Sequence, residues 1–177
     1  SARVSSGFQK ISELTNQSIK DIEELAKNGD SVTGVPTGFL DFDNKTTGLQ
    51  PGDLIIVAGR PSMGKTSFAL NLAEYAALKN NSVTAIFSME MAAEQLSSRL
   101  ISSIGRINAQ KVRTGQLTDD DWPRITNAVA LLSKADIYID DTPALTPIDI
   151  RARARRLKRE KGLDLIVIDY MQLMQLN

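Results

Sequence analysis

The sequence predicts an α/β domain with a mostly parallel sheet covered by helices on both faces. Short apolar runs alternate with segments of helical periodicity along most of the 177 residues. Strands separated by helices in this way usually connect in parallel, and the helices then bury both faces of the sheet. A second observation agrees: a glycine-rich segment at residues 59–66 joins an apolar run to a helical pattern.

The first predicted element is an amphipathic helix within a linker segment, residues 1–30. Its apolar residues recur at helical spacing, at Ile11, Leu14, Ile19, Ile22, Leu25 and Ala26. The pair Asn28-Gly29 ends the helix. Residues 30–52 are rich in Gly, Thr, Asp and Pro, which indicates irregular structure leading into a second domain at 31–177.

The second domain is predicted to alternate strands and helices from residue 54 onward. Strands are expected at 54–58, 82–88, 136–140 and 165–170, and helices at 66–79, 93–104, 121–134 and 147–161. The chain ends seven residues after Tyr170 without a helix to cover the last strand. It also begins with Ser1 rather than Met, so we expect a piece of a longer protein, incomplete at the C-terminal end of this domain.

The composition excludes several kinds of site. Lys plus Arg and Asp plus Glu both number 21, so no net field draws the chain to nucleic acid or membrane. The absence of Cys and His rules out disulfides, thiolate nucleophiles, imidazole or thiolate metal sites and histidine-dependent triads. No apolar run has the ~20 residues of a membrane span, and the N-terminus lacks the apolar core of a signal peptide. A cytoplasmic location without membrane contact is expected.

The glycine-rich segment is predicted to bind the phosphates of ATP or another nucleoside triphosphate. It fits the pattern G-x-x-x-x-G-K-[ST] between a strand and a helix, and its residues are Gly59, Arg60, Pro61, Ser62, Met63, Gly64, Lys65 and Thr66, followed by Ser67. The glycines let backbone N–H groups approach phosphate oxygens, and the helix dipole adds to the attraction. Lys65 is expected to reach the β- and γ-phosphates and Thr66 to ligate Mg²⁺. The alternative is a Gly/Pro-rich turn with an incidental lysine.

Acidic residues follow three predicted strands, where ligands gather in parallel sheets: Glu90, Asp140 with Asp141, and Asp169. An ATPase needs one aspartate that orients Mg²⁺ and one carboxylate that polarises the attacking water. The strand before Asp169 is the more uniformly apolar, which favours Asp169 over Asp140 for the metal. Asp140 and Asp141 are alternatively turn residues, and Glu90 is alternatively a residue that opens the next helix.

Several motifs occur in one order and spacing that match a known family from about residue 11 onward. They are TGVPTG at 33–38, GLQPGDL at 48–54, the phosphate loop, FSMEM at 87–91, RTGQL at 113–117 and IDYMQLM at 168–174. With these motifs the chain resembles the hexameric replicative DNA helicases of the DnaB type, which have RecA-like P-loop NTPase cores. The resemblance implies ATP hydrolysis coupled to movement along single-stranded DNA and duplex unwinding.

The resemblance also assigns roles to individual residues. It makes Glu90 the catalytic glutamate that activates water, Asp169 the aspartate on the magnesium side and Lys65 the phosphate-binding lysine. It further implies a homo-hexamer in which the helix at 11–27 packs on the neighbouring subunit, with docking on its own domain as the alternative. Primase and a helicase loader are implied partners, in a bacterial cytoplasm.

In the family, the DNA-binding loops and the arginine finger follow the strand that ends at Asp169. This piece is therefore expected to bind nucleotide and hydrolyse it poorly, since an arginine finger contributes ~10³–10⁵ in rate. Two other functions stay open: a RecA-like recombinase or clock-type ATPase, and a non-catalytic assembly or loader-binding module.

A basic segment at 151–161 needs its own interpretation. Thr146-Pro147 is predicted to open its helix, and Ile150, Ala154 and Leu157 form a stripe at helical spacing. The arginines then occupy the remaining faces. A solvated or intersubunit surface is favoured over DNA contact for them.

Overall fold

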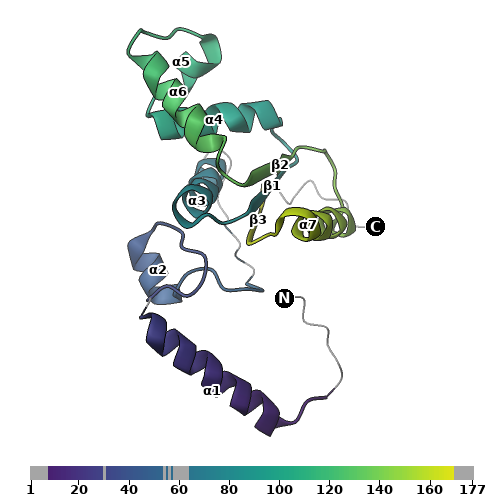
Figure 1. Ribbon diagram of the computed structural model, residues 1–177. Coiled ribbons are helices and arrows are strands. Elements are labelled where there is room, and N and C mark those ends of the chain that lie inside the picture. The colour runs from purple at the N-terminus through teal and green to yellow at the C-terminus, as the bar shows by residue number, and fades with distance from the viewer. Residues whose placement is uncertain (1–7, 30, 54, 56, 58–63, 170–177) are drawn as a thin grey trace.

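The structure is a computed structural model that describes residues 8–29, 31–53, 55, 57 and 64–169. At its centre lies a three-stranded sheet between helices on both faces (Figure 1). The strands are β1 (Thr84–Ser88), β2 (Ile137–Asp140) and β3 (Leu165–Asp169), and their order is β2-β1-β3. Both neighbours pair with β1 in parallel. The predicted parallel sheet is therefore confirmed for these three strands.

Strand β1 is buried along its whole length and sends alternate side chains to two separate cores. Ala85 and Phe87 pack with α7 (Pro147–Lys161) through Ile150 and Ala154. On the other face, Ile86 packs with residues of α3 (Lys65–Asn80) and α4 (Ala93–Gly105), namely Leu70, Ala73, Leu96 and Leu100. The predicted cover of helices on both faces is confirmed.

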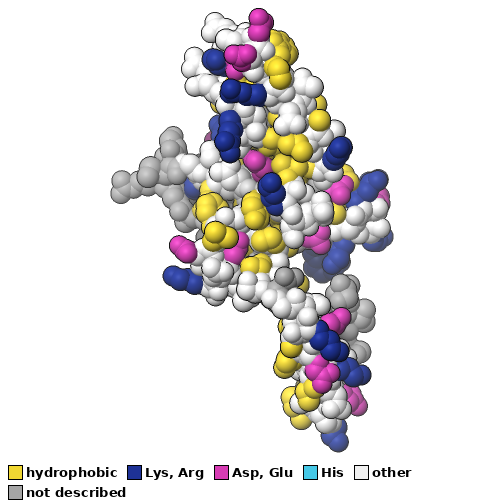
Figure 2. Space-filling view, turned by 60° about the vertical axis from the view of Figure 1, so that its left-hand side comes forward, with side chains coloured by type: hydrophobic (Ala, Val, Ile, Leu, Met, Phe, Trp, Pro, Cys, Tyr) yellow, Lys and Arg dark blue, Asp and Glu magenta, His cyan; other side chains and the backbone are white. Residues whose placement is uncertain are grey.

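Helix α1 (Ile11–Asn28) forms as predicted and ends at Gly29, whose φ of +66° is left-handed. None of its residues is buried. Its apolar stripe is exposed by 43–74%, at Ile11, Leu14, Ile19, Ile22 and Leu25. Figure 2 shows hydrophobic side chains along one side of this protruding helix and charged ones along another. The structure therefore gives no support to docking of α1 on its own domain.

Two other predictions need correction or lie outside the described residues, and one further helix was not predicted. Residues 30–52 contain a short helix, α2 (Leu40–Thr46), and α5 (Ala109–Thr114) precedes the predicted α6 (Asp121–Leu132). Helices of six or seven residues carry too few turns for a periodic pattern, and tertiary contacts stabilise them instead. Of the strand expected at 54–58, only Ile55 and Val57 are described, and neither belongs to a strand.

A buried aspartate anchors the loop before α2. Asp43 is 4% exposed and accepts hydrogen bonds from the Thr37 N–H (2.9 Å), the Thr37 hydroxyl (2.7 Å) and the Gly38 N–H (3.0 Å). A Cβ at Gly38 would lie 2.6 Å from the ring of Tyr75 in α3, so the backbone approaches α3 too closely for any other residue. The adjacent Phe39 ring stacks on Phe68 of α3, with centroids 5.2 Å apart.

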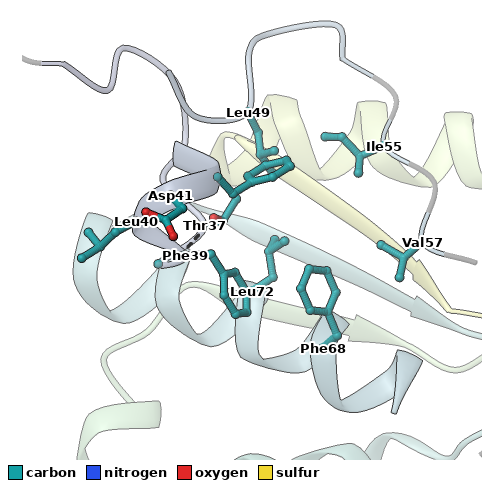
Figure 3. A pocket seen from close by; sticks show the side chains of 11 residues that line it. Thr37, Phe39, Leu40, Asp41, Leu49, Ile55, Val57, Phe68 and Leu72 are labelled. Atoms are coloured by element: carbon teal, nitrogen blue, oxygen red, sulfur yellow. Dashed lines mark hydrogen bonds between the residues drawn. The ribbon is translucent and has the colours of Figure 1, made fainter. Parts of the chain in front are cut away.

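This loop and α3 line an open apolar pocket of about 970 Å³ (Figure 3). Its lining includes Phe39, Phe42, Val57, Phe68 and Leu72. Phe68 and Leu72 are four residues apart and share one side of α3, whereas Thr66 is two residues from Phe68 and faces elsewhere. The pocket is thus separate from the carboxyl edge of the sheet, where the predicted acids lie.

Thr84 in β1 offers a test of the core. It is fully buried, and its hydroxyl has no hydrogen-bond partner among the described residues. Thr84→Val keeps the shape and removes the unsatisfied group, so we expect about 1 kcal/mol of added stability in urea unfolding. Thr37→Val is the matched control: Thr37 is 3% exposed and its hydroxyl is bonded to Asp43, so the same change should destabilise the chain. Equal effects of the two substitutions would contradict this account.

Candidate active site

Helix α3 starts at the residues predicted to hold phosphate. Its N-cap is Gly64, with a left-handed φ of +80°, and no atom of the described residues lies within 4 Å of a Cβ built there. Glycine is therefore required at this position by the backbone conformation rather than by space. The first N–H groups of a helix have no partner within the helix and attract anions. Lys65 and Thr66 stand in this first turn, followed by Ser67.

Gly59, Arg60, Pro61, Ser62 and Met63 lie outside the described residues, so their part in nucleotide binding stays a prediction.

The structure brings together Thr66 and Asp169, the two residues predicted to bind Mg²⁺. The Thr66 hydroxyl donates a hydrogen bond to the Asp169 carboxylate, with 2.9 Å between Oγ1 and Oδ2, although the residues are 103 positions apart. Both offer hard oxygen ligands, which Mg²⁺ prefers. The described ranges contain no cluster of three or more metal-ligating side chains. This arrangement fits Mg²⁺, which is usually bound by one or two protein oxygens together with phosphates and water.

Glu90 leaves the sheet next to this pair. The parallel register sets Ser88 opposite Asp169, and Glu90 follows two residues after Ser88. Its side chain is exposed and makes no hydrogen bond or ion pair with any other described residue. A carboxylate in this position is available to a water molecule at the edge of the sheet.

Asp140 lies at the same edge but has other partners. Arg153 of α7 donates to its Oδ2 (2.6 Å) and to the Thr142 hydroxyl (2.8 Å), while the Thr142 N–H bonds Asp140 Oδ1 (3.0 Å). Burial acts to raise the pKa of Asp140, but the hydrogen bonds from Arg153 and Thr142 outweigh it and lower the pKa. Asp140 is thus the last residue of β2 and is bonded to Arg153 and Thr142, whereas Asp169 is the acid that contacts Thr66. Its preference over Asp140 for the metal stays a prediction.

Helix α7 has the predicted start and stripe. The Thr146 hydroxyl caps it, Pro147 is its first residue, and Ile150 and Ala154 are buried. Two of its arginines are engaged within the chain: Arg153 with Asp140, and Arg156 with Glu160 at 2.9 Å. The contact between Arg153 and the end of β2 was not predicted, because no sequence spacing relates a helix residue to the end of a strand beside it.

Comparisons with known proteins bear on the family and the fold. Residues 34–177 match the family described as "DnaB-like helicase C terminal domain". The chain is 53% identical to the replicative DNA helicase DnaB of Geobacillus stearothermophilus, over 97% of the chain and 38% of that protein. It is 52% identical to the replicative DNA helicase DnaC of Bacillus subtilis (strain 168), over 96% of the chain and 37% of that protein. The chain thus spans less than two-fifths of these relatives.

Solved structures give the same result. One ATPase domain superposes with a TM-score of 0.87 at 32% identity, covering 96% of this chain and 60% of that one. A DnaB-like replicative helicase, described together with its interactions with primase, superposes with a TM-score of 0.80 at 32% identity, covering 92% and 40%. The predicted RecA-like α/β class is confirmed. From the extent of the sequence match and the agreement in fold, the chain belongs to the family of the DnaB-like helicase C-terminal domain.

Proposed function

We propose that this chain is part of the ATPase motor of a replicative DNA helicase and that it binds ATP with Mg²⁺ at the carboxyl edge of its sheet. The hydrogen bond between Thr66 and Asp169, with Glu90 emerging beside it, is the observation that carries the proposal. Family membership supports it, because the curated relatives are replicative DNA helicases.

Each residue has a role in this proposal. The segment from Gly59 to Ser67 surrounds the phosphates, and Lys65 places its charge on the β- and γ-phosphates. Thr66 and Asp169 hold Mg²⁺, which when bound neutralises charge on the phosphates. Glu90 orients a water molecule and accepts its proton as the water oxygen attacks the γ-phosphorus and the bond to ADP breaks.

The proposal extends to the assembly. We place a boundary near residue 31, with α1 as a linker helix that packs on the neighbouring copy in a homo-hexamer. Single-stranded DNA, primase and a helicase loader are the proposed partners, in the bacterial cytoplasm. No helix in the described part of the chain is long and apolar enough to cross a membrane.

The test is unwinding of forked DNA by the full-length protein. ATP-dependent strand separation is expected, and it should require Mg²⁺. ATP turnover without strand separation would favour a recombinase or clock-type ATPase. No turnover at all would favour a non-catalytic assembly module.

The exposed apolar stripe of α1 is the basis of a separate prediction about assembly. Each apolar side chain removed from water contributes ~1.5–3 kcal/mol, so Ile22→Glu in the full-length protein is expected to weaken the hexamer. Light scattering with Mg-ATP would show loss of the sixfold mass. Lys20→Glu is the control, because residues two apart on a helix face different sides. A hexamer that withstands Ile22→Glu would contradict the role of α1.

A further inference from the structure

The backbone around Glu90 determines where its carboxylate lies, because the side chain has no hydrogen-bond or ionic partner in the described ranges. Its two neighbours are anchored on opposite faces of the sheet. Met89 is 7% exposed and belongs to the core that includes Ile150 of α7. Met91 packs against the core that includes Leu96 of α4. Small shifts of the turn between β1 and α4 would therefore move Glu90 directly.

Ser88 closes the turn on the strand side. Its hydroxyl is fully buried and donates to the Met91 carbonyl (2.9 Å) while accepting the Met91 N–H (3.2 Å). This pair of hydrogen bonds joins the residues on both sides of Met89 and Glu90. The turn is thus restrained where it leaves β1.

The helix side of the turn has one acceptor within α4, Gln95 Oε1 for the Ala92 N–H (3.2 Å), and a second one from elsewhere. The N-cap of α4 is Ala92, whose side chain has no oxygen to accept the free N–H groups of the first turn. Asp141 supplies one from the end of β2, 48 residues away: the Ala93 N–H donates to its Oδ2 at 2.9 Å. A carboxylate there is also stabilised by the helix dipole.

Asp141 is itself held in place by its neighbours. The residues on either side of it, Asp140 and Thr142, are both bonded to Arg153 of α7. A continuous set of contacts therefore runs from α7 through the end of β2 to the first residue of α4. That residue, Ala93, is three positions after Glu90.

We propose that Asp141 is a positioning residue that aligns Glu90 through the first turn of α4. This inference rests on the water-activating role proposed above for Glu90. A general base must lie within hydrogen-bond reach of its water, and a displacement of about 1 Å can reduce the rate ~10²-fold. Loss of the Asp141 contact is thus expected to lower kcat more than it lowers nucleotide affinity.

The first experiment compares Asp141→Ala, Asp141→Asn and Asp164→Ala in the full-length protein. Asp141→Ala should lower the kcat of ATP hydrolysis about 10–100-fold with less than about a twofold change in the Kd of a fluorescent ATP analogue. Asp141→Asn keeps an oxygen acceptor and should stay within about threefold of the parent. Asp164 is the matched control: it is also exposed and accepts one backbone N–H, from Val83 at 2.8 Å, but at the opposite end of the sheet.

The second experiment removes the donor instead. Ala93→Pro deletes the N–H that Asp141 accepts, at the first helical position, where proline is tolerated. Ala92 already has ψ near 151°, a conformation compatible with a following proline. Ala93→Pro should lower kcat as Asp141→Ala does, and the double variant should be no slower than either single variant.

Hydrogen exchange adds a readout that does not depend on turnover. The segment 88–95 should exchange faster in Asp141→Ala and in Ala93→Pro than in the parent, and not in Asp164→Ala. The inference would be overturned if Asp141→Ala left kcat or the exchange rate unchanged. It would also be overturned if Asp164→Ala lowered kcat as much as Asp141→Ala, or if the effects of Asp141→Ala and Ala93→Pro on kcat multiplied in the double variant. A parent protein that does not hydrolyse ATP would instead overturn the proposed function, while the exchange data would still test the contact.

Discussion

Replacing Glu90 by glutamine is expected to slow ATP hydrolysis by the full-length protein about 10²–10⁴-fold, the usual contribution of a general base. The amide keeps the size of the side chain and removes its ability to accept a proton from water. Glu90 is exposed and makes no hydrogen bond or ion pair with described residues that the substitution would break. Nucleotide affinity and thermal stability should therefore remain close to those of the parent.

The measurement is a single-turnover ATPase assay together with a nucleotide titration. Glu94→Gln is the matched control, because Glu94 is also exposed and lies in the first turn of α4, just after the same turn. It should leave hydrolysis unchanged. If Glu90→Gln hydrolysed ATP at the parent rate, another group would have to activate the water.

Replacing Lys65 by alanine is expected to weaken ATP binding about 10–100-fold. A hydrogen bond to a charged group contributes ~1.5–3 kcal/mol, and each 1.4 kcal/mol is a factor of ten in affinity. Lys65 is the first residue of α3, one position before Thr66, so its charge is presented at the same helix end as the proposed metal site. Turnover should fall further than affinity, since negative charge on the phosphates increases during the reaction.

Fluorescent nucleotide titration in the presence of Mg²⁺ tests this expectation. Lys79→Ala changes an exposed lysine in the last turn of the same helix and should leave the affinity as it was. Unchanged binding by Lys65→Ala would mean that the predicted phosphate loop does not hold the nucleotide.

Local patterns were sufficient to predict the elements with long, regular signals. Helix α3 starts at the lysine of a glycine-lysine motif, and β1 has the apolar centre Ala85-Ile86-Phe87 of a buried strand. The cap of α7 was evident because Thr146 and Pro147 adopt their roles in almost any context. In such segments, the conformation that the local sequence favours is the one found in the folded structure.

Features that depend on distant partners were harder to predict. Asp169 and Asp140 both end apolar strands, and the choice between them depends on Thr66 and Arg153, which sequence spacing does not relate to either. Helix α2 was missed for a different reason: it is too short for a periodic pattern, and the buried carboxylate of Asp43 stabilises it by accepting hydrogen bonds from residues six and five positions earlier. One signal at the start of α4 was available: Ala92 has no capping oxygen, which leaves the first N–H groups of α4 for water or for an acceptor from another part of the chain.

The composition of β3 has a practical consequence for Asp169. Residues 165–168 are all Leu, Ile or Val, a composition prone to intermolecular strand pairing and aggregation. Asp164 and Asp169 flank this run as gatekeepers whose negative charges oppose such pairing. A substitution that neutralises Asp169 is therefore also expected to promote aggregation. Asp169→Glu keeps the negative charge but moves the carboxylate oxygens, so it changes Mg²⁺ binding without removing the charge that opposes self-association.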